Sequence, residues 1–340
     1  MILINIIAII SSIFYLISKK IESYEILIAA RFLTGFLSGF FCGVCPVYLN
    51  ELSPINLRGF LGTINALAIC VGNLVANIFG LPDILGTLTL LPYLLGVLPL
   101  ILSFVHLVGL PFCVESPKYL FITKNRSNEA RKSLEKIVKD ENLIDYEMNQ
   151  LRIEKDQISN QKEGSYMDLI RVKSLRKALL VSVILQASQQ FSGIIAVITY
   201  STRIFISIGL DAKTWAIYAA IFLSAIETLC HFLCMFIIDL TGRRVLILVG
   251  LASMSLCCFV LGLIQIFIIN QLWLKILAVV AVTVYIIFYS FGPGPIPLLV
   301  TAELFDTEYR GKATSIAVFL NWFFNFMISV SFPYIEVNIF

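Results

Sequence analysis

The amino-acid sequence predicts an α-helical protein that crosses a membrane many times. Of its 340 residues, 59% are hydrophobic and only 14% are charged, and the mean hydropathy is +0.90. A water-soluble domain of this length cannot bury so much apolar surface. The apolar residues are gathered in long runs, and two of these runs are followed by the same short motif. Together these features predict a bundle of membrane-spanning helices with an internal repeat.

Nine apolar segments can be placed along the chain. Most exceed the ~20 residues that a membrane-spanning helix needs. The first segment is short, but it lacks the basic start and the small-residue cleavage site of a signal peptide, so we interpret it as a span as well. The segments are 2–17, 26–50, 58–81, 88–113, 178–206, 214–238, 244–268, 272–302 and 311–334.

Residues 114–177 form the only extended polar region. They carry fourteen basic residues between Lys118 and Lys177, and charges of opposite sign alternate through 127–157 with apolar residues at helical spacing between them. We expect short amphipathic helices here, on the cytosolic face. A solvated linker is the alternative interpretation.

A glycine- and proline-rich motif, Gly292-Pro293-Gly294-Pro295-Ile296-Pro297, interrupts segment 272–302. Proline removes a backbone donor and clashes with the preceding turn, whereas glycine adds conformational freedom. Such a break is tolerated within a membrane only where the backbone is buried in protein or lines a wet cavity. Broken helices near the bilayer midplane are typical of the sites where transporters bind their substrates.

Two copies of one motif reveal the internal repeat. Glu51-Leu52 precedes Arg58-Gly59 by the same interval at which Glu303-Leu304 precedes Arg310-Gly311, and six apolar segments separate the copies. We therefore expect two six-helix halves, with this chain holding nine of twelve helices: two would be absent before Met1 and one after Phe340. The halves would be 1–113 and 178–340, joined by the linker 114–177.

Several motifs in order carry a resemblance to a known family. They are Arg31-Phe32-Leu33-Thr34-Gly35, Glu51-Leu52-Ser53-Pro54 with Leu57-Arg58-Gly59, Glu115-Ser116-Pro117-Lys118, Gln189-Gln190-Phe191-Ser192-Gly193-Ile194, Asp239-Leu240-Thr241-Gly242-Arg243-Arg244, the glycine–proline motif and Asn321-Trp322. Along its whole length the chain resembles the facilitative hexose transporters, in the sugar porter branch of the major facilitator superfamily. The resemblance implies the major facilitator fold, cytosolic termini, a sugar as the transported partner, and transport by alternating access.

The resemblance also implies where sugar binds. Uncharged amides suit a ring of hydroxyls, because each group both donates and accepts hydrogen bonds. In the family, the equivalents of Gln189 and Gln190 bind sugar, and we expect Gln186, Asn321, Asn325 and Asn73 to add amides, with Gly292 at the helix break. The alternative role for each amide is a hydrogen bond between helices.

This sequence departs from the family pattern at positions near the sugar. Ile195, Ser290 and Leu298 stand where the family usually has Asn, Glu and Trp, Glu227 stands where it has Asn, and Ala66 where it has Gln. The scaffold motifs are kept, so the departures put the identity of the sugar in doubt.

The resemblance implies that charged residues at the cytosolic helix ends form ion pairs that clasp the two halves when the transporter faces outward and open as it turns inward. Ordinary positive-inside anchoring is the alternative, and Leu240 stands where the family usually has a further arginine. The expected gating residues are Glu51, Arg58, Glu115, Asp239, Arg243, Arg244, Glu303 and Arg310.

Glu227 lies near the middle of segment 214–238, where a carboxylate is costly, and we expect it to pair with His231, four residues on. The alternative is a protonated Glu227 that is hydrogen-bonded to another helix. Glu227 favours a second functional class, namely a proton-coupled carrier or a carrier of a polyol or another polar solute. A third class is a truncated membrane protein that does not transport.

The chain is not expected to be an enzyme or to bind nucleic acid, a cofactor or a metal. The eight cysteines lie in or beside apolar segments, where thiols behave as small hydrophobes. The expected surroundings are a lipid bilayer, with the plasma membrane as the location.

Overall fold

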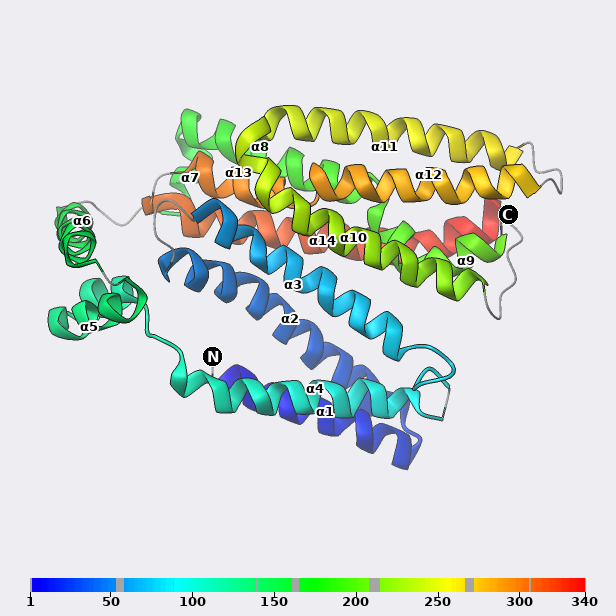
Figure 1. Cartoon of the computed structure of the whole chain (residues 1–340), viewed down its shortest axis with the longest axis horizontal. Helices are drawn as coiled ribbons and strands as arrows, with labels where there is room; N and C mark the ends of the chain where they lie inside the picture. Colours follow the sequence, from blue (N-terminus) through cyan, green and yellow to red (C-terminus); the bar gives the residue numbers. More distant parts are fainter. Residues whose placement is uncertain are drawn as a thin grey trace. The chain divides into compact units, whose positions relative to one another are not determined.

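The computed structural model describes residues 2–52, 58–87, 89–138, 140–160, 165–207, 215–266, 272–305 and 307–339. This part of the chain is built from helices (Figure 1). It contains eight helical stretches long and apolar enough to cross a membrane, and Ile64–Phe79 forms a shorter apolar helix. These nine stretches correspond to the nine apolar segments of the sequence.

The chain divides into two compact units, Met1–Asn65 with Ile78–Lys162, and Ala66–Asn77 with Glu163–Phe340. The elements of the first unit are α1 (Ile2–Ile21), α2 (Tyr24–Leu52), both ends of α3 (Arg58–Phe79), α4 (Leu91–Gly109), the short helices η2 (Leu110–Phe112) and η3 (Tyr119–Thr123), α5 (Ser127–Ile137) and α6 (Glu141–Asn160). The middle of α3 belongs to the second unit.

In the first unit, α1 packs against both α2 and α4. Polar side chains on these helices find partners on the neighbouring helix: Asn5 Oδ1 lies 3.0 Å from His106 Nδ1, and Ser11 Oγ donates to the Ala30 carbonyl at 3.0 Å. Unpaired polar groups are costly in hydrocarbon, so these bonds favour close packing of the helices. α5, α6 and η3 share a small apolar core that includes Leu134.

The second unit contains α7 (Asp168–Arg171), α8 (Lys173–Phe191), α9 (Ile194–Ser207), α10 (Trp215–Thr241), α11 (Arg243–Ile266), α12 (Leu272–Phe291), α13 (Ile296–Leu304) and α14 (Thr307–Ile339). α8 packs against α13 and α14, and α12 packs against α10 and α11. The four helices α9, α10, α11 and α12 share an apolar core that includes Ile194, Leu223, Met254 and Tyr285.

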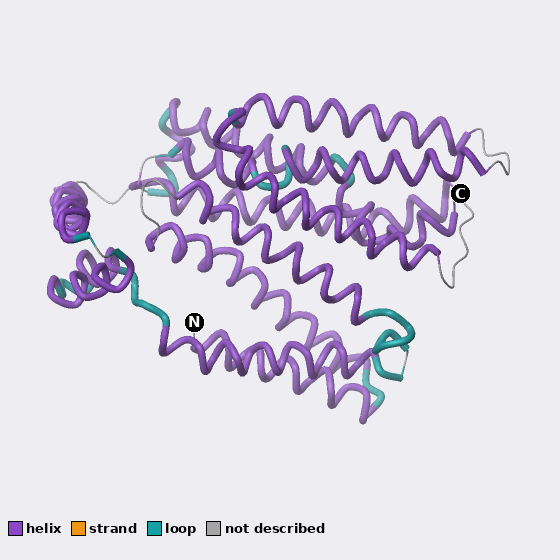
Figure 2. The backbone as a smooth tube through the Cα atoms, in the orientation of Figure 1, coloured by secondary structure: helices purple, strands orange, loops and turns teal. Residues whose placement is uncertain are grey.

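The first break in this unit divides α8 from α9 (Figure 2). It lies within segment 178–206, which the sequence predicts to be one continuous span. Gly193 has a φ of +91° there, a backbone conformation that only glycine adopts without strain. The helix therefore ends at Phe191 and restarts at Ile194. The break could not be predicted from the continuous apolar run, because a single glycine is compatible with an uninterrupted helix.

The second break divides α12 from α13 and lies where the glycine–proline motif predicts it. Gly292 allows α11 to approach closely, since a Cβ at this position would lie 2.5 Å from the Leu246 carbonyl oxygen. On α11, a Cβ at Gly250 would lie 2.7 Å from Pro293 Cδ. The two glycines thus fit the break against the neighbouring helix.

Candidate functional site

Amide side chains from α8 and α14 meet inside the second unit. Asn321 Nδ2 donates to Gln186 Oε1 and to Gln189 Oε1, both at 2.7 Å, and Asn321 Oδ1 accepts from Gln190 Nε2 at 3.0 Å. The exposed fractions of the three glutamines are only 2%, 9% and 5%. Their spacing of three and four residues places them on one face of α8. The structure therefore brings four of the predicted amide residues together.

One acceptor in this amide cluster lacks a partner. Gln190 Oε1 is buried, and no donor among the described residues bonds to it. Leaving such a group unpaired costs about 1–3 kcal/mol. A hydroxyl group suits this oxygen, because it can donate to the oxygen and accept from a neighbouring amide.

The broken helix supplies a second set of polar atoms beside the cluster. Gln189 Nε2 donates to the Gly294 backbone carbonyl at 2.7 Å and lies 3.4 Å from the Tyr289 hydroxyl. The interruption between α12 and α13 makes that carbonyl accessible to a side chain. Gln189 thus connects Asn321 on α14 with the glycine–proline break.

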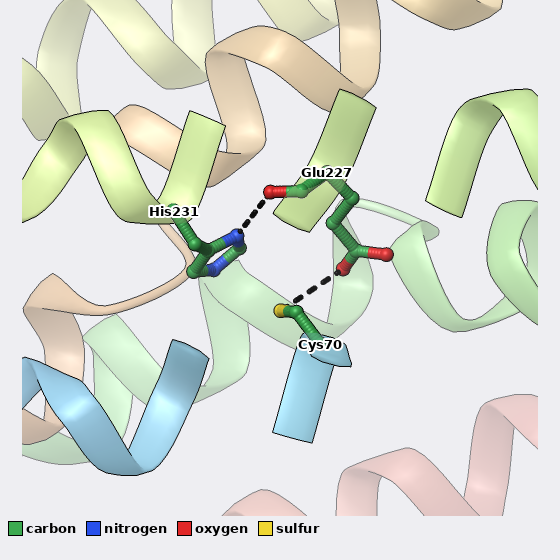
Figure 3. Close-up of side chains that lie close together, drawn as sticks. All are labelled: Cys70, Glu227 and His231. Atoms are coloured by element: carbon green, nitrogen blue, oxygen red, sulfur yellow. Dashed lines mark hydrogen bonds between the residues drawn. The ribbon is translucent and has the colours of Figure 1, made fainter. Parts of the chain in front are cut away.

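Three side chains of metal-ligand type gather on α3 and α10 (Figure 3). Cys70 Sγ lies 3.9 Å from Glu227 Oε1, and His231 Nδ1 lies 3.0 Å from the backbone carbonyl oxygen of Glu227. All three residues are buried, and one ligand atom from each lies within 4.8 Å of the other two. A carbonyl oxygen only accepts hydrogen bonds, so Nδ1 is the donor and Nε2 keeps a free lone pair in the neutral ring.

This arrangement differs in part from the expected pair of Glu227 and His231. The two residues share one face of α10, as the spacing predicts. The imidazole, however, bonds to the backbone of Glu227, and the carboxylate is directed at Cys70 on α3. Spacing along one helix cannot reveal a partner that another helix supplies.

The middle of α3 makes a second polar contact with α10. Asn77 Nδ2 donates to Ser224 Oγ at 2.7 Å. Asn73 is exposed and Ala66 is half-buried. Asn77 and Cys70 therefore both face α10, whereas Asn73 lies outside the amide cluster.

Other positions predicted near the sugar make contacts of their own. Ser290 is wholly buried and donates to the Ile286 carbonyl of its own helix at 2.9 Å. Asn325 Oδ1 accepts from Ser329 Oγ at 3.4 Å on α14. Ile195 packs against the apolar core of α9 to α12. The structure does not bring these three side chains into the amide cluster.

Leu298 and Gly292 lie at the helix break. Leu298 is half-buried on the first turns of α13, and Gly292 contacts α11. Gly292 belongs to the glycine–proline motif, and Leu298 directly follows it. The same motif contains Gly294, whose carbonyl accepts from Gln189.

Among the predicted gating residues whose side chains the structure describes, one ion pair is formed. Arg243 Nη2 lies 3.1 Å from Glu303 Oε1, with exposed fractions of 32% and 49%. Arg310 Nε donates to the Phe305 carbonyl at 3.3 Å. Glu51 is half-buried, Arg244 and Glu115 are exposed, and the side chains of Arg58 and Asp239 lie outside the described set.

Two tyrosines of α12 also belong to the site, although neither is among the residues predicted from the sequence. Tyr285 donates to the Ser192 carbonyl at 2.9 Å, at the break between α8 and α9, and the Tyr289 hydroxyl contacts Gln189. Their spacing of four residues, directly before the glycine–proline motif, is a usable signal. A buried tyrosine hydroxyl requires a partner, and broken helices supply accessible carbonyls.

Solved structures share this fold. The match to the proton:xylose symporter XylE bound to 6-bromo-6-deoxy-D-glucose has a TM-score of 0.81 at 24% identity, covering 99% of this chain and 72% of that one. The inward-open xylose transporter XylE from E. coli matches with a TM-score of 0.75 at 22% identity, over 98% of this chain and 71% of that one. The chain has the fold of the major facilitator superfamily.

Curated relatives are similar in sequence along almost the whole chain. Facilitated glucose transporter member 4 of solute carrier family 2 from Mus musculus is 38% identical over 97% of this chain and 64% of its own length. Member 3 from Gallus gallus is 36% identical over 99% of this chain and 66% of its own length. This chain thus spans slightly less than two thirds of these relatives. The family model described as sugar (and other) transporter matches residues 1–340, and the chain belongs to that family.

Proposed function

We propose that this chain carries a hexose across a membrane by facilitated diffusion. The observation that carries the proposal is the buried amide cluster of α8 and α14, in which Gln190 Oε1 has no partner among the described residues. The names of the relatives, facilitated glucose transporters, support the same substrate class.

The amide cluster can exchange its internal hydrogen bonds for bonds to a sugar. One hydroxyl donates to Gln190 Oε1, and others replace the bonds between Asn321 and the glutamines. Amides carry no net charge, so the site binds a neutral ligand without placing a charge in the membrane. Binding therefore remains reversible, as release on the far side of the membrane requires.

Transport then proceeds by alternating access, without a covalent step. The two halves of such a carrier rock around a central site, and ion pairs at the cytosolic helix ends bias one state over the other. We assign the pair of Arg243 and Glu303 to that bias. A carrier of this kind takes up sugar at the cell boundary, and we propose the plasma membrane as its location.

The test is stereospecific binding and uptake. The chain is purified in detergent, titrated with D-glucose and L-glucose by calorimetry, and reconstituted into proteoliposomes for uptake of the labelled sugars. The proposal expects saturable binding and uptake of the D enantiomer only. Equal responses to the two enantiomers, or no response from folded protein, would overturn it.

A second candidate is a proton-coupled carrier, which the buried carboxylate of Glu227 favours. An intramembrane carboxylate is a typical proton relay. The distinguishing experiment is uptake against a concentration gradient in the presence of a protonophore. Facilitated diffusion is insensitive to the protonophore and never concentrates the sugar, whereas coupled transport collapses.

A further inference from the structure

We propose that Cys70, Glu227 and His231 bind a zinc ion in the interior of the second unit. The cluster combines a thiol, a carboxylate and an imidazole, each of which is an ordinary ligand of Zn²⁺. The three side chains come from two helices, α3 and α10, so the site exists only in the folded chain (Figure 3). Spacing along the sequence gives no sign of it, since 157 residues separate Cys70 from Glu227.

The distances suit a tetrahedral ion after a small contraction. Bonds of roughly 2.3 Å to sulfur and roughly 2.1 Å to oxygen place those two atoms about 3.6 Å apart in a tetrahedral site. Cys70 Sγ and Glu227 Oε1 are 3.9 Å apart, and a ring nitrogen of His231 lies within 4.8 Å of a ligand atom from each. Side-chain rotations that bring the ligand atoms closer by up to roughly 1.4 Å complete the coordination, with a fourth position left for water.

The imidazole is already oriented for metal binding. Ligating histidines usually donate their second ring N–H to a carbonyl or carboxylate, which fixes the tautomer and the plane of the ring. His231 Nδ1 makes this bond to the Glu227 backbone carbonyl at 3.0 Å. The remaining nitrogen, Nε2, therefore presents its lone pair as the ligand atom.

The charges balance when zinc is bound. The Cys70 thiol loses its proton to solvent as the sulfur–zinc bond forms, and Glu227 binds as the carboxylate. One thiolate, one carboxylate and a neutral imidazole cancel the double charge of the ion. An electrically neutral site is the arrangement that a low-dielectric interior tolerates best. Mg²⁺ and Ca²⁺ do not suit this site, because they prefer a larger set of oxygen ligands.

Bound zinc would restrain the protein, because it ties α3 to α10. The stretch Ala66–Asn77 is continuous at both ends with residues of the first unit. The ion also lies beside the amide cluster, since a Cβ at Gly294 would be 3.1 Å from His231 Nε2, and the Gly294 carbonyl bonds to Gln189. We therefore expect zinc to inhibit transport; this consequence rests on the proposed function, whereas zinc binding does not.

The binding test uses Zn²⁺ titration by calorimetry and Co²⁺ as a spectroscopic probe of the full chain in detergent. The wild-type chain should bind one ion and show a thiolate-to-cobalt charge-transfer band. Cys70→Ser should abolish the band, and His231→Gln should weaken affinity at least about tenfold. Cys70→His should retain cobalt binding without the band, which separates ligand loss from misfolding.

Two controls address the other cysteines. Cys234, also buried on α10, contacts the Phe291 carbonyl instead of the cluster, and Cys234→Ser should leave the band intact. Cys42 and Cys45 form a C-x-x-C pair on α2, and their double serine variant should also keep it. A band that survives Cys70→Ser and disappears in the α2 double variant would overturn the proposed site.

The transport arm compares hexose uptake with and without Zn²⁺. Added Zn²⁺ should lower wild-type uptake, whereas the uptake rate of Cys70→Ser should be the same with and without Zn²⁺. Zinc that binds through Cys70 without slowing uptake would overturn the inhibitory role. A chain that takes up no hexose in any condition would refute the proposed function, while the titration would still decide whether the zinc site exists.

Discussion

The Nε2 atom of Gln189 donates a hydrogen bond to the backbone carbonyl of Gly294 at 2.7 Å. This bond ties the amide cluster of α8 and α14 to the break between α12 and α13. On the proposed function, a sugar that competes for Gln189 would also release a carbonyl at the break. Ligand binding would then be coupled to the conformation of the broken helix through this one side chain.

Replacing Gln189 with leucine should weaken D-glucose binding roughly tenfold or more. A lost neutral hydrogen bond is worth about 0.5–1.5 kcal/mol, and a stranded buried partner costs about 1–3 kcal/mol. Calorimetric titration measures the change, with Asn5→Leu as the matched control. Asn5 is an equally buried amide on α1, outside the cluster. Unchanged affinity in Gln189→Leu would assign this amide to helix packing alone.

Much of the amide cluster can be predicted from the sequence, because residue type and helical spacing are properties of a short stretch of chain. Three glutamines within five residues of one helix must share a face, and an amide in a span requires a partner. The glycine–proline motif likewise marks a break that the structure contains between α12 and α13. The choice of Asn321 over Asn325 as the partner of the glutamines depends on how α14 packs, which local spacing does not determine.

Leu298→Trp should raise selectivity for glucopyranose. A flat ring offers a stacking surface to the C–H face of a pyranose, and leucine offers none. Leu298 is half-buried on α13, next to the break. A competition panel of hexoses and polyols against labelled glucose measures the effect, with Leu298→Met as the control for bulk. An unaltered panel in the tryptophan variant would place this residue outside the site.

Gly193→Ala should destabilise the chain by roughly 1–2 kcal/mol, the cost of a left-handed backbone for a residue with a Cβ. The structure leaves open space around that Cβ, so strain is the only expected effect. Gly262, within α11, also has open space but an ordinary helical backbone, and Gly262→Ala should be neutral or stabilising. Thermal unfolding in detergent gives both values; equal effects would refute a positive φ at Gly193.

The ion pair of Arg243 and Glu303 should show a small coupling energy. The side chains are 32% and 49% exposed, and pairs of this kind contribute about 0.2–1 kcal/mol. Arg243 makes a further interaction, so Arg243→Gln should cost more than Glu303→Gln. A double-mutant cycle on thermal unfolding and on the uptake rate measures the coupling. Additive effects of the two substitutions would mean that the pair does not bias the states.

The surroundings of Glu227 can be predicted only in part from the sequence. The position of a carboxylate in the middle of a span is evident from hydropathy, and His231 follows at helical spacing. Cys70 reaches Glu227 from α3, and no pattern within either helix predicts that approach. The same holds for Asn77 and Ser224, because both contacts depend on the packing of α3 against α10.

Glu227→Gln should flatten the pH dependence of hexose uptake between about pH 5 and 8, the range in which a nearby imidazole also titrates. Charging this carboxyl within a span is costly, so we expect the neutral form to support the transport cycle. Wild-type uptake then falls as the pH rises and Glu227 ionises, whereas the glutamine variant keeps the acid-side rate throughout. The titratable groups around this carboxyl are Cys70 on α3, His231 on α10 and, beside the His231 ring, Tyr289 on α12.

Uptake into proteoliposomes buffered to equal pH on both sides measures this profile without a proton gradient. His231→Gln should shift the midpoint of the wild-type profile without removing it, because the carboxyl still titrates. Glu141→Gln changes an exposed carboxylate on α6 and should leave the profile unchanged. If wild-type uptake is already constant over this range, Glu227 does not gate transport, and its carboxylate serves only the contact with Cys70 and the proposed zinc site.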